Sequence, residues 1–531
     1  MSAYLIVIYV VCGVYMVMNL KHDIHMLQQN SYRLPRYWKY LKNDIGSTWR
    51  LVDVAMLFLT FATLLDIRLA LLIVAMVCVT KVCLILKKKF KKPLVFTKRV
   101  WRIYSVAGIL SVGIYLAAIL CAKDGVGVYS APAIAVGMLL LETIFSWVIV
   151  MAAVVILMPV EKMINRRYWN EASSILKSMP DLKVVGITGS YGKTSTKHYL
   201  ERILGEDFEV LMTPGSFNTP MGVIRTVREM MKPYHQIFIC EMGAKQRGDV
   251  KEICDLVNPE IGIITAVGPM HLESFKTMEN VQATKFELAD ALPADGLAVV
   301  NNDFEYCASR PVDNVECVRY CLGDDKSGKC AYEAKDIKYS SEGTSFTVVG
   351  PDGLELPLTT RLVGGCNISN LLGAVIVALH LGMSKDAIAR AVSQIQQVEH
   401  RLSIKQTPGG VTIIDDAFNS NPSGSKMALE VLSDFKDGKR IVVTPGMIEL
   451  GDRQFELNEQ LGREIAKNVD VAIVVGQYNR EAIVKGIQEE GFPEDNLHQV
   501  GSFAEAQQVL AGIMKPGDTV LYENDLPDTF K

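Results

Sequence analysis

The sequence predicts an N-terminal, multi-span α-helical membrane segment followed by two α/β domains. Five long apolar stretches lie in the first 160 residues, whereas short β-branched runs alternate with helical stretches in the rest of the chain. The charge balance changes at the same place. Residues 1–160 hold 17 Lys and Arg against 6 Asp and Glu, although the whole chain of 531 residues has a formal net charge of −3.

The apolar stretches cover residues 1–20, 51–65, 69–86, 100–122 and 131–159. Most of them approach the roughly 20 residues that an α-helix needs to cross the hydrocarbon core, so they predict five membrane spans. Only Asp66, Ile67 and Arg68 separate the second stretch from the third, and one long helix is an alternative there. A cleaved signal peptide is not expected at residues 1–20, because no basic region precedes them and no small-residue cleavage site follows.

The basic residues predict the orientation of these spans. Residues 21–50 carry six basic and two acidic side chains, and residues 87–102 carry eight basic side chains and no acidic ones. Loops rich in Lys and Arg stay on the cytoplasmic side. Five spans with both loops inside place the N-terminus outside and everything after residue 160 in the cytoplasm.

The α/β region is predicted to follow a connector at residues 161–181 and to form two domains, residues 182–405 and 406–531. Runs such as "KVVGIT", "QIFICEM" and "IGIITAV" in the first domain, and "VTIIDDA" and "RIVVTPG" in the second, read as buried strands. Their alternation with helical stretches is typical of mainly parallel sheets flanked by helices.

The stretch "GITGSYGKTSTK" predicts a phosphate-binding loop between a strand and a helix. The strict nucleotide-binding pattern fails, because Ile187 stands where it needs a further glycine. The remaining residues, 189–194, supply backbone N–H groups for a phosphate, the Lys193 amine for the outer phosphates and the Thr194 hydroxyl for Mg²⁺. The candidate nucleotide-binding residues of this loop are Gly189, Ser190, Gly192, Lys193, Thr194 and Ser195.

Charged side chains follow the neighbouring strands. Glu241 ends the run "IFICEM", His271 follows "IGIITAV", and Lys285 lies in the helical stretch "ATKFEL". Open α/β sheets carry their functional side chains at the carboxyl ends of the strands. Each residue also has an ordinary explanation, such as a loop histidine or a solvated helix lysine. The eleven cysteines predict no metal site, because no CxxC pair occurs and Cys317 and Cys321 lack further ligands at zinc-site spacing.

The ordered set of motifs resembles the Mur ligase family, the ATP-dependent amide ligases of bacterial cell-wall synthesis. The set continues with "GGCNISN", "EHRL", "DDAFNSNP" and "GMIELG", and the resemblance covers residues 182–531. These motifs look most like the branch that adds D-alanyl-D-alanine to a UDP-linked muramyl tripeptide. The resemblance implies a central P-loop ATPase domain and a C-terminal Rossmann-like domain.

The resemblance also implies ATP and Mg²⁺ as cofactors and assigns roles to residues. Lys193 and Thr194 would hold the phosphates and a first magnesium ion, with Glu241 as its protein ligand. His271 matches a ligand of a second metal ion, and Lys285 matches a lysine that the family carries as a carbamate, itself a metal ligand. Asn367 and Asn370 match adenine-side residues, Arg401 and Asp416 match a C-terminal pair that contacts ATP, and Asn218, Asn419 and Asn421 match residues near the substrate.

The implied reaction forms an amide bond through an acyl phosphate, without a covalent enzyme intermediate. The γ-phosphoryl group of ATP activates a carboxylate, and an amine then displaces phosphate. Metal ions and a lysine reduce the repulsion between the carboxylate and the triphosphate.

The sequence departs from the family at three places. Cys366 replaces the histidine of the HNxxN motif, the C-terminal end lacks the common "KGS", and apolar stretches stand where the family has a UDP-binding domain. We therefore expect a multi-pass protein of the bacterial inner membrane. Its carboxylate acceptor would be a muramyl peptide, possibly lipid-linked, presented at the lipid bilayer to an amino acid or dipeptide amine, with the basic residues 21–50 at the headgroups.

Other functions remain open at the level of sequence. A membrane-associated poly-γ-glutamate-type synthetase is an alternative ligase, and a UDP-linked acceptor fits if the helices serve only as an anchor. Outside the ligases, an ATP-driven transporter or an ATP-binding module would also need the phosphate loop. No nucleic acid partner is expected.

Overall fold

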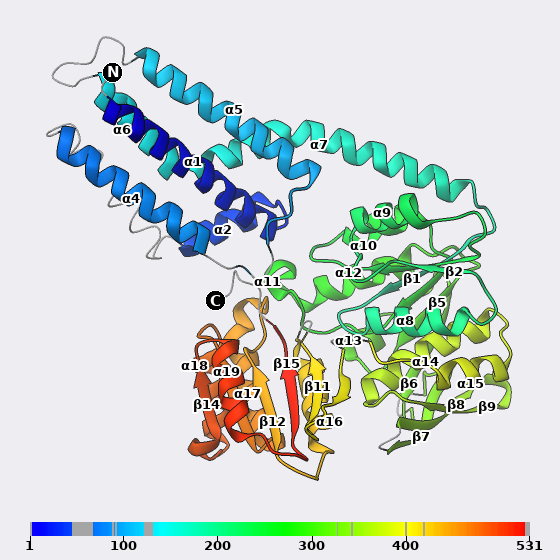
Figure 1. Cartoon of the computed structure of the whole chain (residues 1–531). Helices are drawn as coiled ribbons and strands as arrows, with labels where there is room; N and C mark the ends of the chain where they lie inside the picture. The colour runs from blue at the N-terminus through cyan, green and yellow to red at the C-terminus, as the bar shows by residue number, and fades with distance from the viewer. Residues whose placement is uncertain are drawn as a thin grey trace. The chain divides into compact units, whose positions relative to one another are not determined.

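The computed structural model describes residues 3–44, 67–87, 90, 93–121, 131–325, 328–340, 343–398, 401–417 and 420–525. The chain forms two compact units, Met1–Asn165 and Arg166–Leu526. The first is helical and the second contains both sheets (Figure 1). Helix α7 (Ser146–Lys177) begins in the first unit and ends in the second.

The first unit is a bundle of apolar helices. Helix α1 packs against α4, α5 and α6. Tyr15, Ile24 and Val150 are among the side chains buried in the bundle core. The helices before α7 are α1 (Ala3–Gln29), α2 (Leu34–Asp44), α4 (Ile67–Lys87), α5 (Lys98–Cys121) and α6 (Ala131–Ile144).

The structure does not support the five predicted spans. Among the described residues, two helical stretches, Lys98–Ala117 and Ser146–Lys177, are long and apolar enough to cross a bilayer. The predicted span at residues 131–159 is divided between α6 and α7, and α6 has only 14 residues, fewer than the hydrocarbon core requires. The predicted span at residues 51–65 lies outside the described residues.

A buried polar contact ties α1 to the junction of α6 and α7. The Asn19 amide donates to the Thr143 carbonyl at 2.8 Å and to the Ser146 hydroxyl at 2.9 Å, and that hydroxyl donates in turn to Asp23. Hydrogen bonds of this kind hold helices together where the surroundings are apolar. Helix α7 then continues past Pro159 through the predicted connector, most of which is therefore helical.

The second unit is built first on a nine-stranded sheet in the order β2-β3-β1-β4-β5-β6-β7-β8-β9. Strands β1 to β7 pair in parallel, and β8 and β9 are antiparallel additions. The bounds are β1 (Lys183–Thr188), β2 (Val210–Met212), β3 (Ile237–Met242), β4 (Ile261–Ile264), β5 (Leu297–Asn301), β6 (Glu316–Leu322), β7 (Tyr332–Ser340), β8 (Gly343–Gly350) and β9 (Leu354–Thr360). The central strands are apolar on both faces because helices cover both.

Helices α8, α14 and α15 cover one face of this sheet, and α9, α10 and α12 cover the other. The end of α7 joins the second group through Tyr168, Trp169 and Leu176. The bounds are α8 (Lys193–Leu204), α9 (Pro220–Met230), α10 (Asp249–Val257), α11 (Leu272–Phe275), α12 (Met278–Asp290), α13 (Glu305–Ala308), α14 (Gly365–His380) and α15 (Lys385–Ser393). All the parallel strands end on one edge, and the loops at that edge carry most of the predicted site.

The second sheet has six strands in the order β10-β11-β15-β12-β13-β14, parallel except for β10. Strand β10 (Ser403–Gln406) crosses the predicted domain boundary at residue 405, and it belongs to this sheet. The other strands are β11 (Thr412–Asp416), β12 (Arg440–Thr444), β13 (Val471–Val475), β14 (Leu497–Val500) and β15 (Thr519–Glu523), with helices α16 (Pro422–Ser433), α17 (Gln454–Asn468), α18 (Arg480–Glu489) and α19 (Phe503–Ile513).

Candidate active site

The predicted phosphate loop connects β1 to α8, with Gly192 as the N-cap residue of the helix. Gly192 has a left-handed φ of 79°, and a Cβ atom there would lie 2.1 Å from Asn370 Oδ1. Only glycine meets both conditions without strain. The loop therefore leads directly into the N-terminus of α8, and the free N–H groups of a helix N-terminus favour an anion.

Lys193 folds back over this loop. Its Nζ donates to the Gly189 carbonyl at 2.7 Å and to the Ser190 carbonyl at 3.3 Å. Burial lowers the pKa of Lys193 to about 8, although the carboxylate of Glu241 opposes the shift. An added anion would restore the charged form, so the amine is suited to binding phosphate oxygens.

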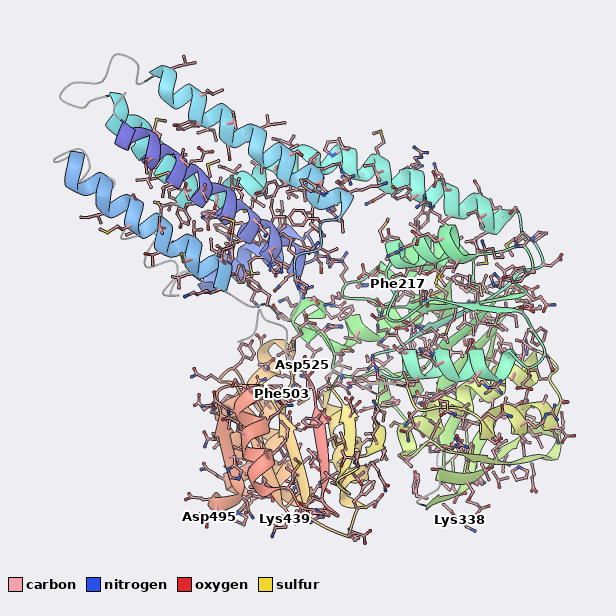
Figure 2. The ribbon with its side chains drawn as sticks, in the orientation of Figure 1. Phe217, Lys338, Lys439, Asp495, Phe503 and Asp525 are labelled. Carbon is pink, nitrogen blue, oxygen red and sulfur yellow. The ribbon has the colours of Figure 1, made fainter. Side chains whose placement is uncertain are left out.

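Glu241 is the centre of a hydrogen-bonded cluster at the end of β3. The Thr194 hydroxyl lies 3.2 Å from both carboxylate oxygens, and Asn218 Nδ2 donates to Oε1 at 3.0 Å. Asn218 follows Phe217 in the loop before α9 (Figure 2). The structure thus brings Thr194 and Glu241, which the family resemblance assigned to one magnesium ion, together with Asn218.

Lys197 completes this cluster, although it was not among the residues predicted from the sequence. Its Nζ lies 2.9 Å from Glu241 Oε2, and both side chains are almost completely buried. Burial alone would raise the pKa of Glu241, but the charges of Lys197 and Lys193 outweigh it and hold that pKa below its ordinary value. The signal was present in "GKTSTK", since residues four apart lie on one face of a helix.

His271 lies in the loop after β4, in a left-handed conformation with φ 53°. Its Nδ1 is hydrogen bonded to the carboxylate of Glu449, which also accepts from Lys245 Nζ at 3.3 Å. Burial lowers the pKa of His271, against the effect of Glu449, so the neutral imidazole is favoured and Nε2 remains an acceptor. In the motif "GMIELG", no sequence pattern marked Glu449 as a functional residue.

Lys285 is buried in α12, with 3% of its surface exposed. Burial lowers its pKa well below the ordinary value, and the charge of Lys193 adds to the shift. A neutral amine is the form that reacts with carbon dioxide, so the surroundings favour the carbamate that the family resemblance implies.

Asn367 and Asn370 lie in the first turns of α14, which packs against α8. The Tyr199 hydroxyl donates to Asn367 Oδ1 at 2.8 Å, and Asn370 Oδ1 lies against Gly192. The structure therefore places Asn370 beside the phosphate loop and Asn367 against α8. Cys366, which replaces the family's histidine, precedes them and is partly buried.

The C-terminal residues form a second group at the carboxyl ends of β11 and β15. Burial raises the pKa of Asp416 to about 6, opposed by the charge of Arg401. Glu523, which the sequence analysis did not name, is fully buried and accepts from Ser420 and Ser425 hydroxyls at 2.5 and 2.7 Å. Asn421 caps α16, accepting from Gly424 N at 2.8 Å, and Asn419 lies outside the described residues.

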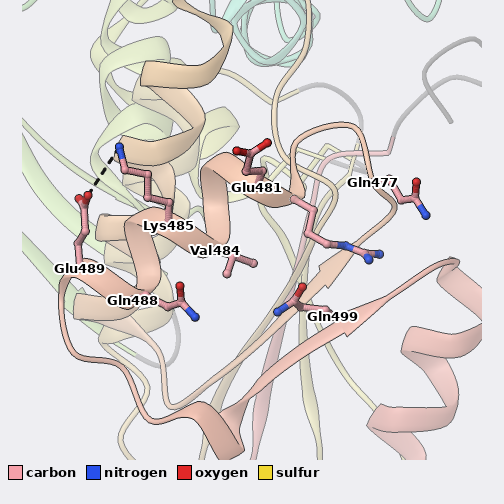
Figure 3. A pocket seen from close by; sticks show the side chains of 8 residues that line it. Gln477, Glu481, Val484, Lys485, Gln488, Glu489 and Gln499 are labelled. Carbon is pink, nitrogen blue, oxygen red and sulfur yellow. Dashed lines mark ion pairs between the residues drawn. The ribbon is translucent and has the colours of Figure 1, made fainter.

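A shallow surface pocket on α18 and β14 lies in a different place (Figure 3). Its lining includes Arg480, Lys485 and Gln499, and Lys485 forms a 3.7 Å ion pair with Glu489. None of the site residues lines it. The chemistry therefore points to the edge of the larger sheet rather than to this pocket.

A phosphate loop, a carboxylate beside its threonine and a second α/β domain with buried acidic groups define a nucleotide-dependent enzyme of the P-loop class. Residues 187–378 match the Mur ligase middle domain, and residues 400–522 match the Mur ligase glutamate ligase domain. The chain belongs to the Mur ligase family and is an ATP-dependent ligase that joins an acid to an amino group.

Similar proteins include the UDP-N-acetylmuramoyl-tripeptide–D-alanyl-D-alanine ligases. The Bacillus subtilis enzyme is 27% identical over 345 residues, which cover 64% of this chain and 72% of that protein. The Escherichia coli enzyme is 28% identical over 323 residues, or 59% and 69% of the two chains. The structure of the MurF ligase of Thermotoga maritima in complex with ADP has a TM-score of 0.61 at 26% identity, covering 68% of this chain and 80% of that chain.

Proposed function

We propose that this protein joins the carboxylate of a muramyl peptide to the amine of an amino acid or dipeptide in the synthesis of peptidoglycan precursors. The observation that carries the proposal is the buried Glu241 carboxylate held beside Thr194 at the mouth of the phosphate loop. The relatives that carry D-alanyl-D-alanine and a muramyl tripeptide in their names support this pair of substrates.

The residues present fit Mg²⁺. Thr194 and Glu241 offer a hydroxyl and a carboxylate close together, and hard oxygen ligands are those that Mg²⁺ prefers. His271 and a carbamate on Lys285 would hold a second ion, with Glu449 orienting the imidazole. The metal ions would supply neutralising charge at the phosphates.

The reaction then proceeds in two steps. A carboxylate oxygen of the acceptor attacks the γ-phosphorus, the new O–P bond forms, and the bond to the β-phosphate oxygen breaks to release ADP. The amine attacks the acyl carbon, phosphate leaves with its bonding electrons, and the amine loses a proton. Lys193 and the N-terminus of α8 stabilise the phosphate charge, and Lys197 keeps Glu241 ionised.

We also propose that the protein is anchored in the bacterial plasma membrane and acts on an acceptor presented there. Large apolar side chains are exposed on α5 and α7, such as Trp101, Ile109, Leu120 and Ile156. Exposed apolar surface of this extent is rare on proteins in water and favours lipid contact. The basic loops would keep the ligase domains on the cytoplasmic side.

Helix α2 supports presentation at the headgroups. It buries Tyr37 and Leu41, while Arg36, Lys39 and Lys42 lie along the same short helix. Basic side chains on such a helix attract anionic headgroups. A pyrophosphate-linked muramyl peptide carries such groups.

The experiment is mass spectrometry of the products formed by the detergent-purified full chain with ATP, Mg²⁺ and D-alanyl-D-alanine. UDP-linked and lipid-linked muramyl tripeptides are offered in parallel, and Glu241→Gln is the matched inactive control. We expect a dipeptide adduct on the lipid-linked acceptor, absent with the variant.

The outcomes separate the parts of the proposal. An adduct on the UDP-linked acceptor alone would retain the ligase and reject membrane presentation. An adduct on neither acceptor, with ATP hydrolysis stimulated by another amine such as glutamate, would reject the muramyl substrates.

A further inference from the structure

A cluster of metal-ligand side chains lies at the β6–β7 junction of the larger sheet, and none of its members was assigned to the candidate active site. Cys321, Asp325 and Cys330 each offer one ligand atom, and these atoms all lie within 4.8 Å of one another. Cys321 is buried near the end of β6, and Cys330 lies two residues before β7. The spacing C-x3-D-x4-C has no CxxC pair, which is why the sequence did not predict a metal site.

The backbone at this junction brings the cluster together. The chain turns back after β6, with Gly323 at φ 69° and Gly328 at φ 66°. The Gly323 N–H donates to the Ala334 carbonyl at 2.9 Å, and the Ala331 N–H donates to the Arg319 carbonyl at 2.8 Å. These bonds attach Gly323 and Ala331 to the β6–β7 pair.

The carboxylate is oriented as well. Asp325 Oδ2 accepts from the Cys330 N–H at 2.6 Å, which fixes the direction of its carboxylate. A backbone hydrogen bond to a ligating carboxylate is a usual feature of metal sites, because it orients the ligand. Asp303, at the end of β5, accepts from the Leu322 N–H at 3.1 Å and adds a second carboxylate next to the cluster.

We propose that Cys321, Asp325 and Cys330 bind a zinc ion. Two thiolates and one carboxylate select Zn²⁺ over Mg²⁺, because thiolates are soft ligands. Three protein ligands leave a fourth tetrahedral position for water or a neighbouring oxygen. The ion would link the two ends of the β6–β7 connection next to Asp303. The Asp303 carboxylate also accepts a hydrogen bond from Ser369 of α14 at 3.5 Å.

The test measures zinc in the full chain, purified in detergent with reductant and without a metal-binding tag. We expect about one zinc per chain by elemental mass spectrometry. Cys330→Ser and Asp325→Asn should lose most of the metal, whereas Cys317→Ser, on the same strand but outside the cluster, should retain it. Removing the ion with a chelator should lower the melting temperature of the wild type and leave that of Cys330→Ser unchanged.

Cobalt provides a second readout that does not depend on stability. Co²⁺ added to the chelated wild type should give thiolate-to-cobalt charge-transfer absorption and tetrahedral d–d bands, and Cys330→Ser should give neither. The proposal is overturned if the wild type binds no zinc after equilibration with Zn²⁺, or if Cys330→Ser binds as much. A Cys321–Cys330 disulfide in the protein purified under reducing conditions, detected as the loss of two hydrogens, would also overturn it.

Discussion

Gly192 is the single residue on which the shape of the phosphate loop depends most directly. Replacing it by Ala costs roughly 1–2 kcal/mol for the left-handed conformation, and the new Cβ would also collide with Asn370 Oδ1. We expect Gly192→Ala to abolish ADP binding measured by calorimetry. Gly248→Ala is the matched control, because Gly248 also caps a helix with φ 89° but has open space around its Cβ. Equal ADP affinity in both variants would show that the contact between a Cβ at position 192 and Asn370 does not disturb the phosphate loop.

Lys197 acts through Glu241. Replacing Lys197 by Met removes the charge that holds down the pKa of Glu241, so the carboxylate should protonate at a higher pH. We expect the acid limb of the pH–rate profile to move to higher pH. Breaking a buried ion pair should also cost about 3–5 kcal/mol of stability. Lys197→Arg keeps the charge and should leave the acid limb at the pH of the wild type. An acid limb that does not move in Lys197→Met would show that Lys197 does not control the ionisation of Glu241.

The loop that follows β4 and the loop that follows β12 meet where His271 contacts Glu449. If Glu449 accepts the Nδ1 proton and leaves Nε2 for a metal ion, Glu449→Gln should weaken the apparent Mg²⁺ affinity by about 10- to 100-fold. The measurement is ligase rate against Mg²⁺ concentration. Glu273→Gln removes a neighbouring negative charge and should leave the Mg²⁺ dependence nearly unchanged. The same loss in both variants would indicate a general effect of charge.

Glu523, the last residue of β15, makes the stability of the smaller sheet depend on pH. Burial raises the pKa of Glu523 to about 8, so the folded state binds a proton that the unfolded state releases above its ordinary pKa near 4.5. Stability from this group is therefore complete below that value and is lost as pH rises towards 8. Glu523→Gln mimics the protonated acid and should flatten the dependence of melting temperature on pH. An unchanged slope would show that Glu523 does not titrate in this range.

The central parallel strands of both sheets, such as β1, β3, β4, β11 and β12, could be predicted because each is a short apolar run between helical stretches. Strands β7 to β10 and β14 have no such run and were not predicted. "KVVGIT" and "IFICEM" form β1 and β3 as expected. The helices of the first unit were harder, because an apolar run does not mark where a helix begins or ends. The run at residues 131–159 is divided near Phe145, and α1 and α7 extend beyond the predicted stretches.

At the scale of the whole molecule, the apolar unit should keep the protein in the membrane. We expect the full chain to stay in the membrane pellet after an alkaline carbonate wash and to be released by detergent. A chain that starts at Arg166 should be found in the supernatant, and it keeps Tyr168, Trp169 and Leu176, which pack in the α/β core. Release of the full chain by carbonate alone would contradict the anchor.

The sequence by itself determined the order of the two parts, the phosphate loop and the family, because these depend on local patterns of apolar residues, glycines and charges. Only the tertiary structure decided which side chains meet. Lys197 pairs with Glu241 across 44 positions of sequence. Glu449, in the loop after β12, reaches His271. Such pairs form because parallel strands and their loops bring distant segments to one edge, and no local pattern records that approach.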